Sequence, residues 1–339
     1  MVDRRSLTTG VLAVLVAMSG VTAWGQAPAA QAPAPAAGAQ GQGAQGRGGQ
    51  GPGGAGRGGR GAAFTPAAGA RDLKSVLYNW TWHMGMLRSG NESELVKTLE
   101  YQAEGGTIQV NGQPCALTKY RISANYQIPG YRTQIECTRP DGQKYTNVET
   151  MSGEYAWDED IPGAELVPGK GKATPRPDAL AERLIRLWAS PHGAPKAAIA
   201  GAAGVPLSES LGQNPATLID RQAAAAAKAT TTLAWQGERA VVTYLIPGVA
   251  GATATATLDS GFLPERIIVK NGTNTTEFVY GNFEDWNNPL FKIEALYAGT
   301  IVERRNGTVV RDLKTKVTEI GQVYVVVPVP DSVKKAAGK

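Results

Sequence analysis

The stretch from residue 231 onward constrains the fold more than any other part of the sequence. It consists of segments rich in β-branched and aromatic residues, separated by short turns that contain glycine. Strands joined by short turns pair in antiparallel order, because a parallel pair needs a long crossover connection. The sequence therefore predicts an antiparallel meander with strands at residues 231–236, 239–246, 252–258, 265–271, 275–283, 292–304, 309–318 and 322–327.

A second β-rich region lies earlier in the chain. Residues 120–128, YRISANYQI, alternate between apolar and polar side chains, which is typical of a half-buried strand. The pairs Pro129-Gly130 and Asp141-Gly142 favour turns. We therefore expect strands at residues 120–128, 131–138, 143–150 and 153–158, followed by a Pro/Gly-rich loop at 161–177.

Four segments have the character of helices. Apolar residues recur at helical spacing between Leu73 and Leu87, and again over residues 179–188, where Pro191 ends the pattern. Further helices are expected at residues 194–203 and 218–228. One antiparallel sheet of about twelve strands must curl or close, and these helices would cover one of its faces. The expected fold class is α+β, mainly antiparallel β: a curled half-barrel sheet with helices packed in its concavity.

The N-terminal region has the pattern of an export signal. Arg4-Arg5 precedes the apolar run VLAVLVAM at residues 11–18, and small residues follow. The expected organisation is a signal peptide at 1–25, of the Sec or twin-arginine type, a disordered Ala/Pro/Gly/Gln-rich spacer at 26–70, a single domain at 71–330 and a flexible basic tail at 331–339. We expect a periplasmic or secreted protein of a bacterial envelope, with no transmembrane span after signal removal.

The charge of the domain argues against a nucleic-acid partner. The full chain has a net charge of +5, but five arginines and one aspartate lie before residue 71. The remainder holds 29 basic and 28 acidic residues and is close to neutral. The sequence contains two cysteines, Cys115 and Cys137, on neighbouring strand-like segments. In an oxidising compartment they are a candidate disulfide; the alternative is two buried free thiols.

The sequence favours binding over catalysis. Its two histidines, His83 and His192, lie about 109 positions apart, and no HExxH, G-x-S-x-G or P-loop motif occurs. We therefore expect no catalytic residue, no metal and no cofactor. One hydrolase hypothesis remains, a carboxylate pair drawn from Glu284, Asp285 or the acidic residues 158–160; we interpret these clusters first as solvated loops.

His192 lies in the stretch LWASPHGAPKAA at residues 187–198. We expect it to cap or tether a turn between two helices, with ligand contact as the alternative. Residues 252–258, ATATATL, place only small apolar side chains on one face. That face would either leave room for a ligand chain or permit close helix packing. The candidate ligand-contacting residues are Trp188, His192, Tyr120, Tyr126, Ala252, Ala254 and Ala256.

The order of elements resembles the LolA-like half-barrel, the fold of periplasmic lipoprotein carriers and related sensor domains. The closest similarities are GFLPER at 261–266, YGNFED at 280–285 and RNGTVVRD at 305–312. The W-x-x-P-H-G stretch from Trp188 to Gly193 resembles one in uncharacterised exported bacterial proteins, some of which carry it ahead of a metallo-β-lactamase-like domain. No H-x-H-x-D-H motif occurs here, so that enzyme is absent. The half-barrel resemblance implies binding of acyl chains or hydrophobic peptide segments.

Two functions remain beside the carboxylate-dependent hydrolase, which is the second alternative. The first is an exported, non-catalytic domain that binds a lipid or another hydrophobic ligand. The alternative is a structural or protein-interaction module that recruits an envelope protein to its outer sheet face or to a strand edge.

Overall fold

The computed structural model describes residues 66–87, 96–221, 226–288, 293–321 and 325–338. All of them belong to one compact unit that spans residues 60–339. The expected signal peptide and most of the expected spacer lie outside the described residues, so both stay predictions.

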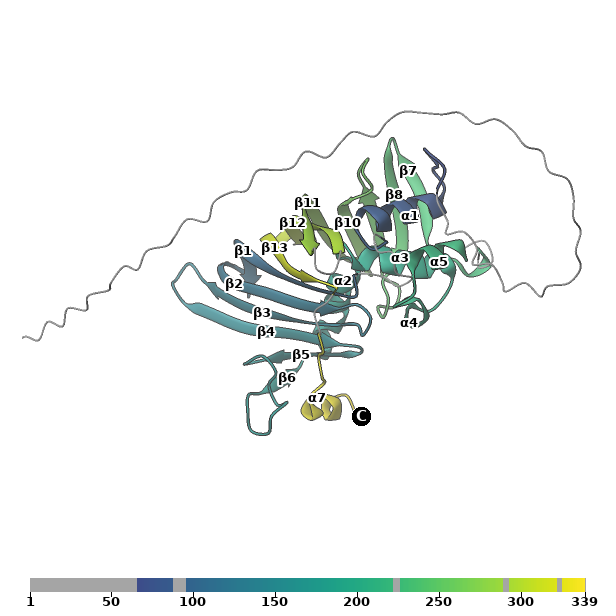
Figure 1. The fold of residues 1–339 in the computed structure, drawn as a ribbon. Coiled ribbons are helices and arrows are strands. Elements are labelled where there is room, and N and C mark those ends of the chain that lie inside the picture. The colour runs from purple at the N-terminus through teal and green to yellow at the C-terminus, as the bar shows by residue number, and fades with distance from the viewer. Residues whose placement is uncertain (1–65, 88–95, 222–225, 289–292, 322–324, 339) are drawn as a thin grey trace, which may run out of the picture. The chain divides into compact units, whose positions relative to one another are not determined.

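Thirteen antiparallel strands form a single open sheet, which confirms the expected fold class. Their order is β6-β5-β4-β3-β2-β1-β13-β12-β11-β10-β9-β8-β7. Neighbours in the sheet are neighbours in sequence except at one place, where β1 pairs with β13 and joins the two meanders (Figure 1). The bounds are β1 Thr98–Val110, β2 Gln113–Asn125, β3 Gly130–Thr138, β4 Lys144–Ser152, β5 Tyr155–Glu159, β6 Ala173–Pro175, β7 Thr232–Gln236, β8 Arg239–Leu245, β9 Thr253–Leu258, β10 Pro264–Asn271, β11 Asn274–Asn288, β12 Ile293–Arg305 and β13 Thr308–Ile320.

The helices α1, α3 and α5 lie together beside β8, where α3 contacts β8 and α1 and α5 pack against α3 (Figure 1). The helix α2 instead contacts β4 and β5. The side chain of Asp72 caps α1 by accepting a hydrogen bond from the backbone N–H of Ser75 at 3.0 Å. The helical bounds are α1 Leu73–His83, η1 Pro177–Ala179, α2 Leu180–Trp188, α3 Gly193–Ala203, α4 Leu207–Ser210, α5 Pro215–Asp220, η2 Ala226–Lys228 and α7 Asp331–Ala336.

The alanine face of residues 252–258 is fully buried. Ala252, Ala254 and Ala256 belong to the same hydrophobic core as the alanines of α3. Small side chains on both elements allow the helix to approach the sheet closely. Cys115 and Cys137 form the expected disulfide, with their Cα atoms 5.5 Å apart, and it joins β2 to β3.

The structure corrects several expected elements. β1 and β6 were not expected, because β1 contains Gly105-Gly106 at a β-bulge that interrupts the alternation, and β6 is only three residues long. Of the expected strand at 322–327, residues 325–327 are irregular and the others lie outside the described residues. Of the expected helix at 218–228, only the parts within α5 and η2 are helical among the described residues.

The segment expected as a flexible basic tail, residues 331–339, contains a short helix. Residues Asp331–Ala336 form α7, which contacts β5 and β6. Val333 is only 3% exposed and packs in a small cluster with Trp157, Ala173, Val325 and Val327. This burial of apolar side chains holds the end of the chain against the sheet.

Candidate ligand-binding cleft

A cleft of about 550 Å³ lies beside α2. Its walls are formed by the end of β1 and the turn that follows it, by residues of β3 and β4, by the β12–β13 hairpin and by α2. The lining residues are Ile108, Gln109, Val110, Asn111, Gly112, Ile135, Tyr145, Glu149, Arg176, Glu182, Arg186, Arg305, Thr308, Val310 and Arg311. This volume lies within the range of small-molecule sites, roughly 300–1,000 Å³.

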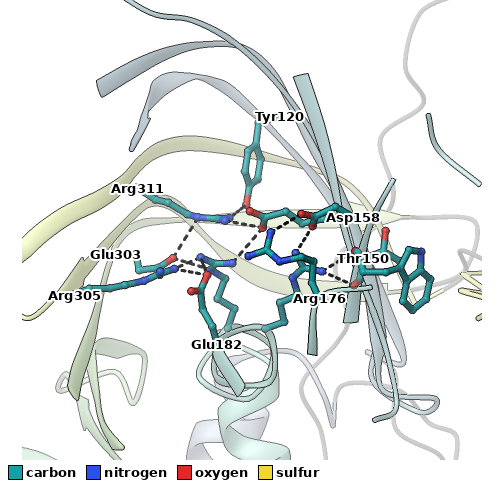
Figure 2. A network of polar contacts seen from close by, with 12 residues as sticks. Tyr120, Thr150, Asp158, Arg176, Glu182, Glu303, Arg305 and Arg311 are labelled. Carbon is teal, nitrogen blue, oxygen red and sulfur yellow. Dashed lines mark hydrogen bonds and ion pairs between the residues drawn. The ribbon is translucent and has the colours of Figure 1, made fainter. Parts of the chain in front are cut away.

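Arg186 and Arg311 line the cleft with side chains that are only 11% and 8% exposed, and we call them, with the two carboxylates that they share, its floor. Figure 2 shows Arg311 within its network of polar contacts. Arg311 on β13 donates from Nη2 to Glu149 at 2.7 Å and from Nη1 to the hydroxyl of Tyr120 at 2.9 Å. Arg186 on α2 donates from Nε to Glu303 at 3.0 Å and from Nη1 to Glu149 at 3.2 Å. A helix and three strands are thus joined through two shared carboxylates.

A more exposed layer of charges covers this floor. Glu182, in the first turn of α2, pairs with Arg186 and with Nη2 of Arg305. Arg305 also donates from Nε and Nη2 to one oxygen of Glu303, at 3.0 and 2.9 Å. The side chain of Glu182 is 37% exposed, whereas that of Glu303 is 2% exposed. The cluster therefore has a buried layer and a solvent-accessible layer.

The acidic residues 158 and 159 belong to this part of the molecule and are not a solvated loop. Asp158 accepts from Arg176 at 2.7 Å and pairs with the buried Arg183, which also donates to the carbonyls of Thr150 and Trp157. The carboxylate of Glu159 is buried and accepts from Arg132, the indole of Trp157 and a backbone amide. Carboxylates away from solvent need such partners. Both residues lie in β5; Asp158 falls within the expected strand at 153–158, and Glu159 extends that strand by one residue.

The arginines keep the buried carboxylates ionised. Burial alone would raise the pKa of Glu303, but Arg186, Arg311 and Arg305 outweigh burial and lower the pKa to about 2. Burial likewise opposes the ionisation of Glu149, and Arg311, Arg186 and Arg183 hold its pKa well below the usual range. All members of the floor are therefore charged at neutral pH.

A smaller cavity of about 50 Å³ lies on the core side of the cluster, and Arg186 and Arg311 line both spaces. Its wall is mainly aromatic and aliphatic, with tyrosines at 101, 120, 126, 131, 280 and 297. Among the described residues the hydroxyl of Tyr131 has no hydrogen-bond partner, and burial raises its pKa to about 12. This inner cavity has room for water molecules but is too small for a drug-sized ligand.

Comparisons with known proteins find a likeness in structure. No family model and no curated protein matches the sequence. A solved domain from Vibrio parahaemolyticus, provisionally named as an outer membrane lipoprotein-sorting protein domain, matches with a TM-score of 0.34 and 9% sequence identity. The match covers 78% of this chain and 98% of that domain. At this level of similarity the match carries no functional argument, and we base the argument on the cleft itself.

The predicted contact residues fall into two groups. Tyr120 and Tyr126 line the inner cavity, and Tyr120 also bonds to Arg311. The other five, which line neither space, are Trp188, His192, Ala252, Ala254 and Ala256. All seven side chains are buried.

His192 ties the start of α3 to the end of α1. Its Nε2 lies 3.1 Å from the carbonyl oxygen of Met84, the C-cap residue of α1, and its ring stacks on Tyr297. Burial lowers the pKa of His192 to about 4, so the ring is neutral at physiological pH.

The remaining carboxylate candidates lie elsewhere. Glu284 and Asp285 are exposed on β11 and do not line the cleft. Within the described residues, no group of three or more His, Cys, Asp or Glu side chains is placed to hold a metal ion. Over the same residues, no helix has the length and apolar character needed to cross a membrane.

Sequence reasoning missed Glu149, Glu182, Arg186, Glu303 and Arg311. They come from separate elements, so no local motif joins them. A signal was present in two of the strands: Glu303 follows Ile301 and Arg311 precedes Leu313 at inward positions where alternation calls for apolar residues. A charged residue at such a position requires a buried partner.

Proposed function

We propose that this protein is an exported envelope domain that binds a lipid or another hydrophobic ligand in the cleft beside α2. The observation that carries the proposal is the cleft itself, whose volume suits a small molecule and whose wall has an apolar side and a charged side. The resemblance of the sequence to LolA-like half-barrels points to the same class of ligand.

The apolar side of the wall supports a hydrophobic ligand. Tyr145 and Val310 are half-buried there, and Ile108, Val110 and Ile135 lie behind them on β1 and β3. A chain laid against these residues removes apolar surface from water, which is favourable by about 25 cal/mol per Å². The outer cleft, and not the inner tyrosine-lined cavity, is therefore the proposed position of the ligand.

The disulfide supports an envelope location. Bonds of this kind persist in oxidising compartments and are rare in the cytosol, and Cys115–Cys137 joins β2 to β3, the strand whose Ile135 lines the cleft. Export through residues 1–25 remains a prediction.

Filling the cleft with a larger side chain tests the proposal. We expect the purified full chain to bind N-phenyl-1-naphthylamine, an uncharged apolar fluorophore. Val310→Trp should weaken that binding about tenfold or more, because the added indole occupies the position of the apolar ligand. Val326→Trp is the matched control, since Val326 is exposed and lies outside the cleft. Equal binding by both variants and the unmodified protein, measured by fluorescence titration, would place the probe elsewhere and refute the proposed site.

A further inference from the structure

We infer that the ligand carries an anionic oxygen group, a phosphate or a carboxylate, beside its apolar chain, and that the Glu182 carboxylate holds the place this group takes. The inference rests on the proposed function and specifies the ligand class of the same cleft.

The charge of the cleft surface favours an anion. The charged residues that line the cleft are four arginines and two glutamates; Glu303 and Asp158, which also pair with these arginines, are not among the lining residues. A concave surface with one dominant sign of charge raises the local concentration of ligands of the opposite sign. Arginine adds geometry to this attraction, because its planar guanidinium binds a phosphate or carboxylate through two parallel hydrogen bonds.

Access distinguishes Glu182 from the other carboxylates of the cluster. Glu149 and Glu303 belong to the buried floor, with 18% and 2% of their side chains exposed, whereas Glu182 is 37% exposed. Figure 2 shows Glu182 projecting from α2 toward Arg305, with Glu303 on the strand beyond it. Glu182 is therefore the carboxylate that a ligand entering from solvent meets first.

The arginines would stay in place if Glu182 moved away. Arg305 keeps two hydrogen bonds to Glu303, and Arg186 keeps its bonds to Glu303 and Glu149. Each guanidinium is thus held from the buried side, and Glu182 occupies the side that faces the cleft. Burial opposes the ionisation of Glu182, but Arg186 and Arg305 outweigh burial and lower its pKa, so the group that another anion would replace is an ionised carboxylate.

The apolar wall defines the rest of the ligand. Tyr145 and Val310 line the same cleft as Arg305 and Arg186. An anion at the arginines would therefore place an attached chain against these side chains. This combination describes an amphiphile with an anionic head.

Calorimetric titration of the full chain with three probes tests the inference. The probes are dodecyl phosphate, dodecyl maltoside with the same chain and an uncharged head, and inorganic phosphate, with both amphiphiles kept below micelle-forming concentrations. We expect dodecyl phosphate to bind Glu182→Gln about tenfold more tightly than the unmodified protein. A tenfold gain in affinity corresponds to a site that the Glu182 carboxylate occupies about nine-tenths of the time in the unmodified protein. Arg305→Lys, which keeps the charge and loses the planar fork, should weaken that binding about tenfold.

Glu265→Gln is the matched control. It removes a carboxylate of similar exposure, 36%, from a surface pair with Arg239 on β8 and β10, outside the cleft lining. We expect this variant to leave all three affinities unchanged. If Glu265→Gln raises the affinity for dodecyl phosphate as much as Glu182→Gln does, or if Glu182→Gln does not raise it, the role of Glu182 is overturned.

The three probes separate the possible failures. If both amphiphiles bind equally and neither responds to the variants, the cleft binds apolar chains and the anionic head is refuted. If neither amphiphile binds, the proposed function itself fails. If inorganic phosphate binds as tightly as dodecyl phosphate and shows the same response to Glu182→Gln, the site is one for a free anion and the attached chain is refuted.

Discussion

At the scale of residues, the central feature is a set of buried charges that depend on one another. Arg186 and Arg311 each contact both Glu149 and Glu303, so removal of one carboxylate leaves two guanidiniums short of a partner. Breaking a buried pair in this way costs about 3–5 kcal/mol, whereas an exposed pair contributes about 0–1 kcal/mol. The floor of the cleft is therefore sensitive to single substitutions and rigid when complete.

The pH dependence of unfolding should show these charges. The folded-state pKa of Glu303 is about 2 and its ordinary value is 4.5. A lowered pKa stabilises the fold above the ordinary value, and this stabilisation is lost as the pH falls toward the folded value. We expect the free energy of unfolding, measured with urea, to fall between about pH 4.5 and pH 2. The fall should be shallower in Glu303→Gln, although that variant is less stable at pH 7.

His192 should act over a different range of pH. Burial lowers its pKa from 6.5 to about 4, so the unfolded chain binds the proton more readily than the folded protein between these values. The contribution of the neutral His192 ring to the free energy of unfolding is therefore complete above about pH 6.5, and it declines as the pH falls toward 4. His192→Asn should remove the part of the decline between about pH 6.5 and pH 4.5, where Glu303 contributes least. An unchanged profile in that range would contradict the buried neutral ring.

At the scale of elements, the sequence predicts those strands and helices whose own residues carry a regular apolar pattern. β3 and β9 alternate regularly and lie where expected, and the apolar stripe of residues 179–188 placed α2 correctly. The same stripe puts Arg183 and Arg186 on the polar face of α2, yet Arg183 is buried and the Arg186 side chain is only 11% exposed, because these arginines contact β4, β5 and β12. Burial of a polar helix face depends on distant strands and leaves no local signal.

The bulge in β1 explains why that strand was missed, and it gives a test. Gly106 has a positive φ of 121°, and a Cβ there would lie 2.0 Å from the carbonyl oxygen of Asp312 on β13. We expect Gly106→Ala to lower the free energy of unfolding by about 1–3 kcal/mol more than Gly112→Ala, because the added methyl group forces apart the β1–β13 pair. Gly112 has a φ of 76° and open space around its Cα, so it controls for backbone strain. If both variants lose the same free energy of unfolding in chemical denaturation, the close approach of Gly106 to Asp312 is contradicted.

At the scale of the whole described unit, one strand pair decides the architecture. The β1–β13 pairing joins residues more than two hundred positions apart and turns two meanders into one sheet. Sequence order predicted a curled sheet of about this width, but neither this register nor the cleft could be predicted, because both arise from segments that meet only in the fold. The helices α1, α3 and α5 lie beside β8 (Figure 1). The cleft lies at the other part of the sheet, where residues of α2, β1, β3, β4, β12 and β13 line it.

The most direct test of the account is mass spectrometry on the protein purified from the envelope of its native host and extracted with organic solvent. The account predicts one amphiphile with an acidic head group, close to one molecule per chain, and its loss from protein that carries Val310→Trp. An extract without any such molecule, from protein that also fails to bind dodecyl phosphate, would contradict the account and favour the alternative of an envelope interaction module.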